Sequence, residues 1–238
     1  MFSTLKLMFV YLTLGSLAGI LGIPYSLMVG NIDLLYRVAM WITKTGVRVA
    51  GIRVEVSGIE NVPVGRSCIF MSNHVSNLDP PVEIPMLPGR SSVLLKKELM
   101  SIPILGRAMR MGQFVPVERG SRRESAKASV EAAAEALRSG LNIMVYPEGT
   151  RSQDGRLSAF KKGPFYLAQE TQAPIVPIAV SGTQTMMRKG SSAIKPGIAR
   201  MRLLPVIEPS QYTTREELME MVRNAIAEAL PPEMKPVI

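Results

Sequence analysis

Cysteine and histidine are almost absent from this chain, since each occurs once in 238 residues. The lone Cys68 excludes an intramolecular disulfide and any zinc or redox site built from paired cysteines. The lone His74 excludes every metal site that needs several histidines. A reaction that requires an imidazole must therefore use His74.

Several nucleotide-binding and hydrolase motifs are also missing. No GxGxxG or GxxxxGK[ST] loop occurs, so nucleotide binding by those loops has no support. No GxSxG elbow occurs, which counts against a membrane-bound lipid hydrolase that pairs His74 with a serine. Aromatic residues make up only 5% of the chain, which argues against a platform for single-stranded nucleic acid, and we expect no nucleic-acid partner.

The charge is strongly positive and unevenly placed. The formal net charge is +9, and hydrophobic residues make up 47% of the chain, which excludes disorder as the main state. Residues 90–127 hold nine basic and three acidic groups, and residues 138–202 hold ten and three, whereas residues 203–238 are acidic. A basic surface of this kind attracts an anionic membrane or a phosphorylated substrate.

A long uncharged segment lies near the N-terminus. Residues 7–32 carry no charged side chain, and as a helix they would be ~39 Å long, more than the ~30 Å hydrocarbon core. No small-residue cleavage site clearly ends the segment, which disfavours a signal peptide. Pro24 is expected to kink this helix or to end a first helix there.

The next segment, residues 34–50, is typical of an interfacial amphipathic helix, with basic residues among apolar ones and the only tryptophan, Trp41. We predict that residues 1–50 form a hydrophobic and amphipathic two-helix membrane anchor. Two arrangements stay open: one spanning helix, or two helices inserted into one leaflet. If the first helix spans, the basic residues after it place the rest of the chain in the cytoplasm.

Residues 51–238 alternate between strand and helix patterns, which indicates an α/β domain. Apolar runs or alternating residues predict strands at 53–56, 67–72, 92–95, 114–117, 143–146, 175–181 and 200–204. Helices are predicted before Gly112, from a capping box at Ser121 and Glu124 to Gly140, over 163–169, and after a second capping box at Thr214 and Glu217.

One candidate catalytic pair follows the predicted strand at 67–72. Asp79 lies five residues after His74, and a carboxylate that holds one imidazole N–H leaves the other ring nitrogen free as a general base. The alternative is an unrelated histidine beside a helix-capping aspartate, because Asp79-Pro80 also resembles a helix start.

A second candidate loop, Tyr-Pro-Glu-Gly-Thr-Arg-Ser at 146–152, follows another predicted strand, where α/β sheets bind ligands. Gly149 allows a sharp turn, and the Arg151 guanidinium suits a phosphate. Glu148 would either bind a substrate hydroxyl or order Arg151. Arg119 also follows a short strand, and lysine pairs occur at 96–97 and 161–162, which elsewhere are often a solvated surface.

Four of these blocks occur in the order of the motifs of the glycerolipid acyltransferases: Asn73-His74 with Asp79, residues 114–119, residues 146–152, and Val-Pro-Ile at 176–178. The chain therefore resembles this family, and within it the bacterial 1-acyl-sn-glycerol-3-phosphate acyltransferases, over roughly residues 50–210. Two departures, Tyr146 where phenylalanine is commoner and Glu118 where aspartate is commoner, preserve the chemical type.

The resemblance implies a mixed, mostly parallel sheet flanked by helices, with residues 51–238 as the acyltransferase catalytic domain. It implies that His74, oriented by Asp79, takes the proton from the sn-2 hydroxyl of 1-acyl-glycerol 3-phosphate. The alkoxide then attacks an acyl thioester, carried by acyl carrier protein or coenzyme A, and phosphatidic acid forms. The implied phosphate-binding residues are Arg119, Arg151 and Lys96, and the implied pocket residues are Asn73, Glu148, Gly149, Thr150 and Lys161.

The same resemblance implies no cofactor or metal beyond the acyl thioester, and membrane phospholipids as partners. It places the chain at the cell inner membrane, with the catalytic domain on the cytoplasmic face. No acyl-enzyme is required, and Cys68 is expected to be a packed apolar residue. Alternatives are another acceptor, such as a lyso-ornithine lipid or glycerol 3-phosphate, a lipid hydrolase, or a non-catalytic protein that binds anionic lipid.

Overall fold

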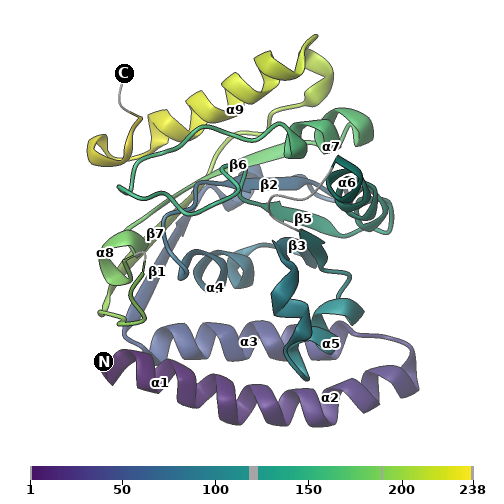
Figure 1. Cartoon of the computed structure of the whole chain (residues 1–238), viewed down its shortest axis with the longest axis vertical. Helices are drawn as coiled ribbons and strands as arrows, with labels where there is room; N and C mark the ends of the chain where they lie inside the picture. Colours follow the sequence, from purple (N-terminus) through teal and green to yellow (C-terminus); the bar gives the residue numbers. More distant parts are fainter. Residues whose placement is uncertain (1, 118–122, 189, 237–238) are drawn as a thin grey trace.

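A seven-stranded sheet organises the chain in the computed structural model, which describes residues 2–117, 123–188 and 190–236 (Figure 1). The strand order is β1-β7-β6-β2-β5-β3-β4, and only the β6–β7 pair is antiparallel. This confirms the predicted mixed, mostly parallel α/β sheet. The strands are β1 (Ile52–Ser57), β2 (Ile69–Ser72), β3 (Ser91–Lys96), β4 (Val115–Val117), β5 (Asn142–Val145), β6 (Ile175–Ser181) and β7 (Gly197–Leu203).

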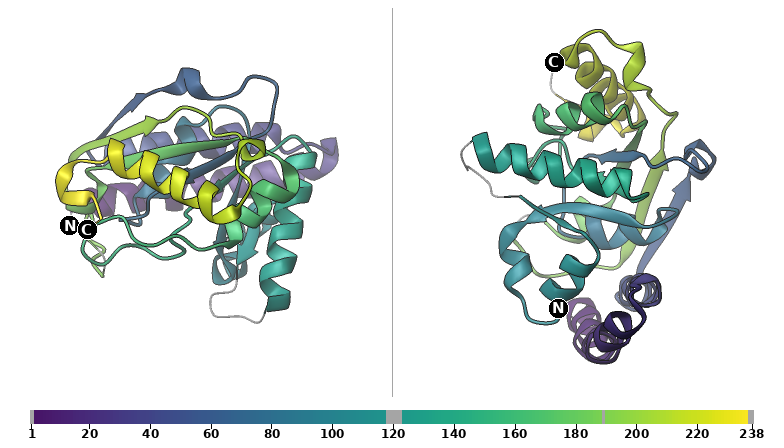
Figure 2. Two further views of the ribbon diagram at one scale, coloured as in Figure 1. Left: turned by 90° about the horizontal axis from the view of Figure 1, so that it is seen from above. Right: turned by 90° about the vertical axis from the view of Figure 1, so that its right-hand side faces the viewer.

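Helices cover both faces of the sheet (Figures 1 and 2). On one face α6 (Arg123–Arg138), α7 (Gly163–Thr171) and α9 (Arg215–Ala229) share a core with β2, β5 and β6. The short helix α4 (Asp79–Glu83) lies on the opposite side (Figure 1). The three central strands are apolar runs without alternation because both of their faces are buried.

The last helix begins where its sequence predicts. Thr214 Oγ1 accepts a hydrogen bond from Glu217 N at 3.2 Å, and the Glu217 side chain accepts one from Thr214 N at 3.2 Å. This confirms the predicted capping box. The other predicted capping box, at Ser121 and Glu124, falls on residues outside those the structure describes in full.

The remaining short helices are α5 (Leu105–Met111) and α8 (Thr183–Met186), with 3₁₀ turns at Ile59–Asn61, Ile84–Met86, Lys97–Ser101, Pro209–Gln211 and Pro232–Met234.

The N-terminal segment forms one long apolar helix that reverses into a second. Helix α1 (Phe2–Val10), a π-helical turn (Tyr11–Gly15) and α2 (Ser16–Val29) are continuous, and their length and composition would suffice to cross a membrane. Helix α3 (Asp33–Val49) then runs back beside them (Figure 1).

Of the two outcomes expected at Pro24, the end of a first helix is excluded, because α2 continues to Val29 and ends only at Gly30, whose φ is 67°. A kink at Pro24 stays a prediction. Proline removes one backbone donor, and a helix interior can tolerate this loss when its neighbours hold it in place.

Small residues allow these helices to pack closely. A Cβ added at Gly46 of α3 would lie 2.7 Å from the Tyr11 ring, and one added at Gly19 of α2 would overlap Ile104, just before α5. At the N-terminus, Thr4 Oγ1 donates to Ser192 O and accepts from Ile194 N, both at 2.9 Å. The N-terminal helices therefore contact the α/β domain at several points along their length, while a boundary near residue 50 stays a prediction.

Candidate active site

His74 and Asp79 meet at the carboxyl end of β2. His74 lies two residues beyond the strand, Asp79 is the first residue of α4, and His74 Nδ1 lies 2.8 Å from Asp79 Oδ2. Asp79 is fully buried and His74 is 9% exposed. The five-residue spacing thus encodes a loop that returns the carboxylate to the imidazole.

The Asp79 carboxylate is held by four groups. Oδ2 also accepts the main-chain N–H groups of Val75 at 2.7 Å and Ser76 at 2.8 Å. Oδ1 accepts the Thr183 hydroxyl at 2.6 Å. Because a carboxylate only accepts, Nδ1 of His74 carries a proton, and in the neutral imidazole Nε2 keeps the lone pair. This is the tautomer that a general base needs.

Glu148 fixes the main chain of His74. Its Oε1 accepts His74 N at 2.6 Å, and its Oε2 accepts Ser158 N at 2.9 Å. Ser152 N in turn donates to His74 O at 2.8 Å. Burial raises the pKa of the Glu148 carboxyl, and the hydrogen bonds from His74 and Ser158 act in the opposite direction. Both oxygens of Glu148 accept main-chain groups. The predicted roles of Glu148, to bind a substrate hydroxyl or to order Arg151, stay predictions.

Asn73 continues the sheet beyond β2. Its Oδ1 accepts Val180 N at 2.8 Å, and its Nδ2 donates to Val180 O at 3.0 Å. The side chain therefore replaces one residue of the β2–β6 ladder and positions His74, its neighbour in the chain. The predicted contact of Asn73 with substrate is not part of this arrangement and stays a prediction.

The loop at 146–152 turns sharply at Gly149, whose φ is +73°. Gly149 N donates to Tyr146 O at 2.9 Å, and Lys161 N donates to Pro147 O at 2.7 Å, so two segments of the predicted pocket lie together. The side chains of Thr150 and Lys161 are exposed and that of Arg151 is half-buried.

The structure describes two of the three predicted phosphate-binding residues, Lys96 and Arg151. Arg119 lies outside the described residues. Lys96, at the end of β3, is exposed and forms an ion pair with Glu98 at 3.0 Å. A phosphate site at Arg119, Arg151 and Lys96 therefore stays a prediction.

Two side chains of the site were missed by reasoning from sequence. Thr183 is 104 residues from Asp79 and follows Gly182, whose φ is +93°. The Tyr146 ring stacks on the His74 ring, with centroids 4.2 Å apart and planes 23° apart. The sequence feature that could have pointed to Thr183 was Gly182, the glycine that follows β6. The feature that could have pointed to Tyr146 was its departure from the phenylalanine common in the motif.

Cys68 takes no part in this site. It is fully buried in the core on the α4 side of the sheet, and burial raises the pKa of its thiol to about 12. A thiol in this state is a poor nucleophile, as the sequence predicted.

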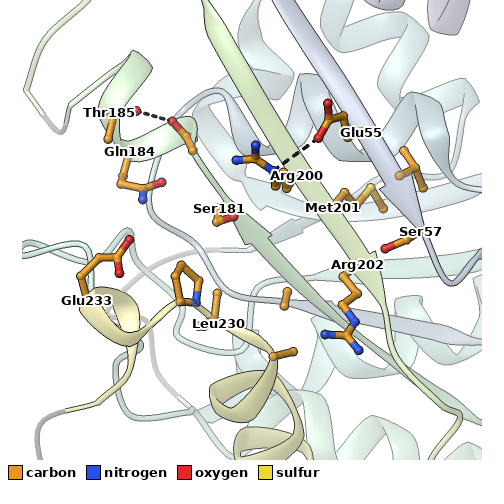
Figure 3. Close-up of a pocket in the computed structure, with 15 residues that line it drawn as sticks. Glu55, Ser57, Ser181, Gln184, Thr185, Arg200, Met201, Arg202, Leu230 and Glu233 are labelled. Atoms are coloured by element: carbon orange, nitrogen blue, oxygen red, sulfur yellow. Dashed lines mark hydrogen bonds and ion pairs between the residues drawn. The ribbon is translucent and has the colours of Figure 1, made fainter.

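A separate pocket of about 650 Å³ opens beside β1, β7 and the end of α9 (Figure 3). Its lining includes Arg200 and Arg202 but also Glu55 and Glu233, and Arg200 Nε lies 3.3 Å from Glu55 Oε2. None of the predicted site residues that the structure describes lines this pocket. Its mixed charges do not by themselves select an anion.

A protein-family model described as Acyltransferase matches residues 53–181, more than half of the chain and all of the His74–Asp79 and 146–152 segments. The 1-acyl-sn-glycerol-3-phosphate acyltransferase of Limnanthes alba is 30% identical over 189 residues, which are 79% of this chain and 66% of that protein. The human 1-acyl-sn-glycerol-3-phosphate acyltransferase alpha is 32% identical over 179 residues, 74% and 63% of the two chains. The chain thus spans slightly less than two thirds of these relatives.

The fold has a counterpart among solved structures. The crystal structure of the 1-acyl-sn-glycerophosphate acyltransferase PlsC from Thermotoga maritima superposes with a TM-score of 0.81 at 25% identity. The match covers 96% of this chain and 93% of that one, so it includes the N-terminal helices as well as the sheet.

Proposed function

Because this chain belongs to the acyltransferase family, we propose that it transfers an acyl chain from a thioester to the sn-2 hydroxyl of 1-acyl-glycerol 3-phosphate, which gives phosphatidic acid. The observation that carries the proposal is the buried dyad, in which four donors to the Asp79 carboxylate fix the His74 tautomer. The similarity to 1-acyl-sn-glycerol-3-phosphate acyltransferases supports the choice of acceptor.

The proposed reaction uses His74 Nε2 twice, first to accept a proton and then to donate it. His74 Nε2 takes the proton of the acceptor hydroxyl as the oxygen forms a bond to the thioester carbonyl carbon. The tetrahedral intermediate then breaks its carbon–sulfur bond, and the leaving sulfur takes the proton from Nε2. Asp79 stabilises the imidazolium between these steps. No acyl-enzyme is needed.

The acceptor phosphate is assigned to Arg119, Arg151 and Lys96, because guanidinium and ammonium groups after the strand ends suit a phosphate monoester. Gly149, Thr150 and Lys161 are assigned to the same pocket. This is supported by the main-chain hydrogen bond between Lys161 and Pro147. The acyl donor is the thioester of acyl carrier protein or coenzyme A.

The apolar N-terminal helix and the relatives indicate that the protein associates with a membrane. The finer proposal is an anchor that lies in one leaflet on the cytoplasmic face of the inner membrane. Contacts of α1 and α2 with α3, with Ile104 and with Ser192 support a helix that lies along the domain rather than across the bilayer. The excess of basic residues over 90–127 and 138–202 supports the cytoplasmic side, because the cytoplasmic leaflet carries the negative surface potential that attracts them.

The test is thiol release from an acyl thioester by detergent-purified protein, with and without 1-acyl-glycerol 3-phosphate. The chain's only thiol, Cys68, is fully buried and adds little background. We expect release that needs both the acceptor and His74, and loss of release in His74→Ala. Glu131→Ala, an exposed substitution on α6, is the matched control and should keep wild-type turnover.

Other outcomes select among the alternatives. Release without acceptor would identify a thioesterase. Release only with lyso-ornithine lipid or glycerol 3-phosphate would change the acceptor, and no release with either donor and any acceptor would leave a non-catalytic lipid-binding protein. Near-normal turnover by His74→Ala would refute the general-base role.

A further inference from the structure

Glu83 is a buried carboxyl that the proposed mechanism does not use. It is the last residue of α4, one turn after Asp79, and it is fully buried. Its Oε1 accepts the Tyr146 hydroxyl at 3.3 Å, and its Oε2 has no hydrogen-bond partner. No ion pair joins Glu83 to a cation among the residues described.

Two buried carboxyls so close together cannot both remain charged without compensation. Asp79 accepts four hydrogen bonds, whereas Glu83 accepts the Tyr146 hydroxyl, has the Ser72 hydroxyl nearby, and keeps Oε2 without a hydrogen bond. The negative charge is therefore stabilised on Asp79. Burial, and then the negative charge of Asp79, raise the pKa of Glu83 well above its ordinary value.

Tyr146 connects Glu83 to the imidazole. Its hydroxyl reaches Glu83, and its ring stacks on His74 with a centroid separation of 4.2 Å. Asp79 holds the edge of the imidazole ring through a hydrogen bond from Nδ1. The His74 ring therefore has an electrostatic support at its edge and an aromatic support on its face.

We propose that Glu83 is a positioning residue that, as a neutral carboxylic acid, holds Tyr146 against His74. A neutral acid keeps a carbonyl acceptor for the Tyr146 hydroxyl without adding a second anion beside the dyad. The proposed transferase activity would depend on this positioning, but the arrangement itself does not rest on the identity of the substrate.

Nuclear magnetic resonance can test the arrangement directly, because the chain has one histidine. Protein without a histidine tag, labelled with ¹³C,¹⁵N-histidine and held in detergent micelles, gives imidazole signals from His74 alone. The face of the Tyr146 ring should shift the His74 ring protons upfield. We expect Tyr146→Leu to abolish the shift, Glu83→Leu to reduce it strongly, and Glu83→Gln to keep it, since glutamine is neutral and retains the carbonyl.

Kinetics separate positioning from general folding damage. In Glu83→Leu we expect kcat to fall about tenfold while the KM for acceptor and thioester stays within about twofold, because the base is displaced but the substrate pocket is not. Glu83→Gln should restore most of kcat. Melting temperatures of the variants identify any that fail to fold.

The outcomes that overturn the proposal are specific. A His74 signal that is unchanged in Glu83→Leu would show that Glu83 does not position Tyr146. If Glu83→Gln lost as much of the upfield displacement as Glu83→Leu, a charged carboxylate would be required. If wild-type protein transferred no acyl group to any acceptor, the proposed function would fail, while the resonance experiment would still decide the role of Glu83.

Discussion

Asp79 accepts four hydrogen bonds, and the donors come from two parts of the chain. His74, Val75 and Ser76 belong to the adjacent loop, whereas Thr183 belongs to α8. A carboxylate bound in this way holds a fixed orientation, and it transmits that orientation to the imidazole. Thr183 is therefore expected to act on the reaction without contacting the substrate.

Replacing Thr183 with valine removes one charge-assisted hydrogen bond to Asp79 and leaves the side-chain volume nearly unchanged. Such a bond contributes ~1.5–3 kcal/mol, so we expect kcat to fall about tenfold or more with little change in KM. Steady-state thiol release measures the effect. Thr185→Val is the matched control on the same helix, because the Thr185 hydroxyl donates to Gly182 O at 2.8 Å. Equal losses in the two variants would contradict the role of Thr183.

The raised pKa of Glu83 makes a prediction about stability and pH. In the folded state Glu83 keeps its proton above the ordinary value of 4.5, where the unfolded chain has released it. Folding then requires proton uptake, so the contribution of Glu83 is most favourable at low pH and declines as pH rises above 4.5.

Glu83→Gln removes this dependence and leaves the other titrating groups in place. We expect its melting temperature, relative to wild type, to rise as the pH is raised above 4.5. Differential scanning calorimetry on both proteins in the same detergent measures this difference. A difference that stays constant with pH would mean that Glu83 is ionised in the folded protein.

At the scale of elements, the site is assembled where β2 and β5 end and α4 begins. The β2 end provides His74, the β5 end provides Tyr146 and Glu148, and α4 provides Asp79 and Glu83. Parallel neighbours in the sheet bring these ends together, since their carboxyl ends share one edge. The turn at Gly149 then directs the chain from β5 past Lys161.

Gly149→Ala tests that turn. Alanine at a φ of +73° costs ~1 kcal/mol, and its Cβ would lie 3.3 Å from Lys161 Cγ, which must move. We expect the acceptor KM to rise several-fold and the dyad to remain intact. Gly140→Ala, also at positive φ but with open space around the Cβ, controls for backbone strain alone. Equal KM values for the acceptor in the two variants would show that the turn at Gly149 does not shape the acceptor pocket.

At the scale of the whole molecule, the N-terminal helices lie at one end and α9 lies at the other, with the sheet between them (Figures 1 and 2). Helices α3 and α5 both pack against α2. Exposed apolar residues gather on α1, α2 and α3, which include Phe9, Leu21 and Trp41. Basic residues on α5, such as Arg107, accompany this apolar surface, since α5 packs against α2. Together they suit a membrane with anionic headgroups.

Binding to vesicles tests this orientation. A cation near an anionic surface contributes ~1 kcal/mol, so Arg107→Ala should weaken binding to phosphatidylglycerol vesicles about fivefold and leave binding to phosphatidylcholine unchanged. Arg223→Ala on α9, at the far end of the molecule in Figure 1, is the control and should bind as wild type. Co-sedimentation at low and high salt gives the values, and equal effects of the two substitutions would refute the orientation.

The sequence alone was enough for features whose partners are near in the chain. The His74–Asp79 pair spans five residues, the Thr214–Glu217 cap spans three, and the apolar runs of the central strands follow from burial on both faces. The Arg119, Arg151 and Lys96 assignment came from the family motifs and stays a prediction. Of the kink or helix end expected at Pro24, the end is excluded, because packing against neighbours compensates for one missing hydrogen bond.

Only the tertiary structure decided the contacts that join distant segments. Thr183 reaches Asp79 across 104 residues, and Glu148 reaches His74 across 74, because strand order in the sheet, which no local pattern encodes, makes their ends neighbours. The stacking of Tyr146 on His74 and its hydrogen bond to the buried Glu83 arise in the same way. Local spacing thus determined the reactive pair, and long-range packing determined what holds it in place.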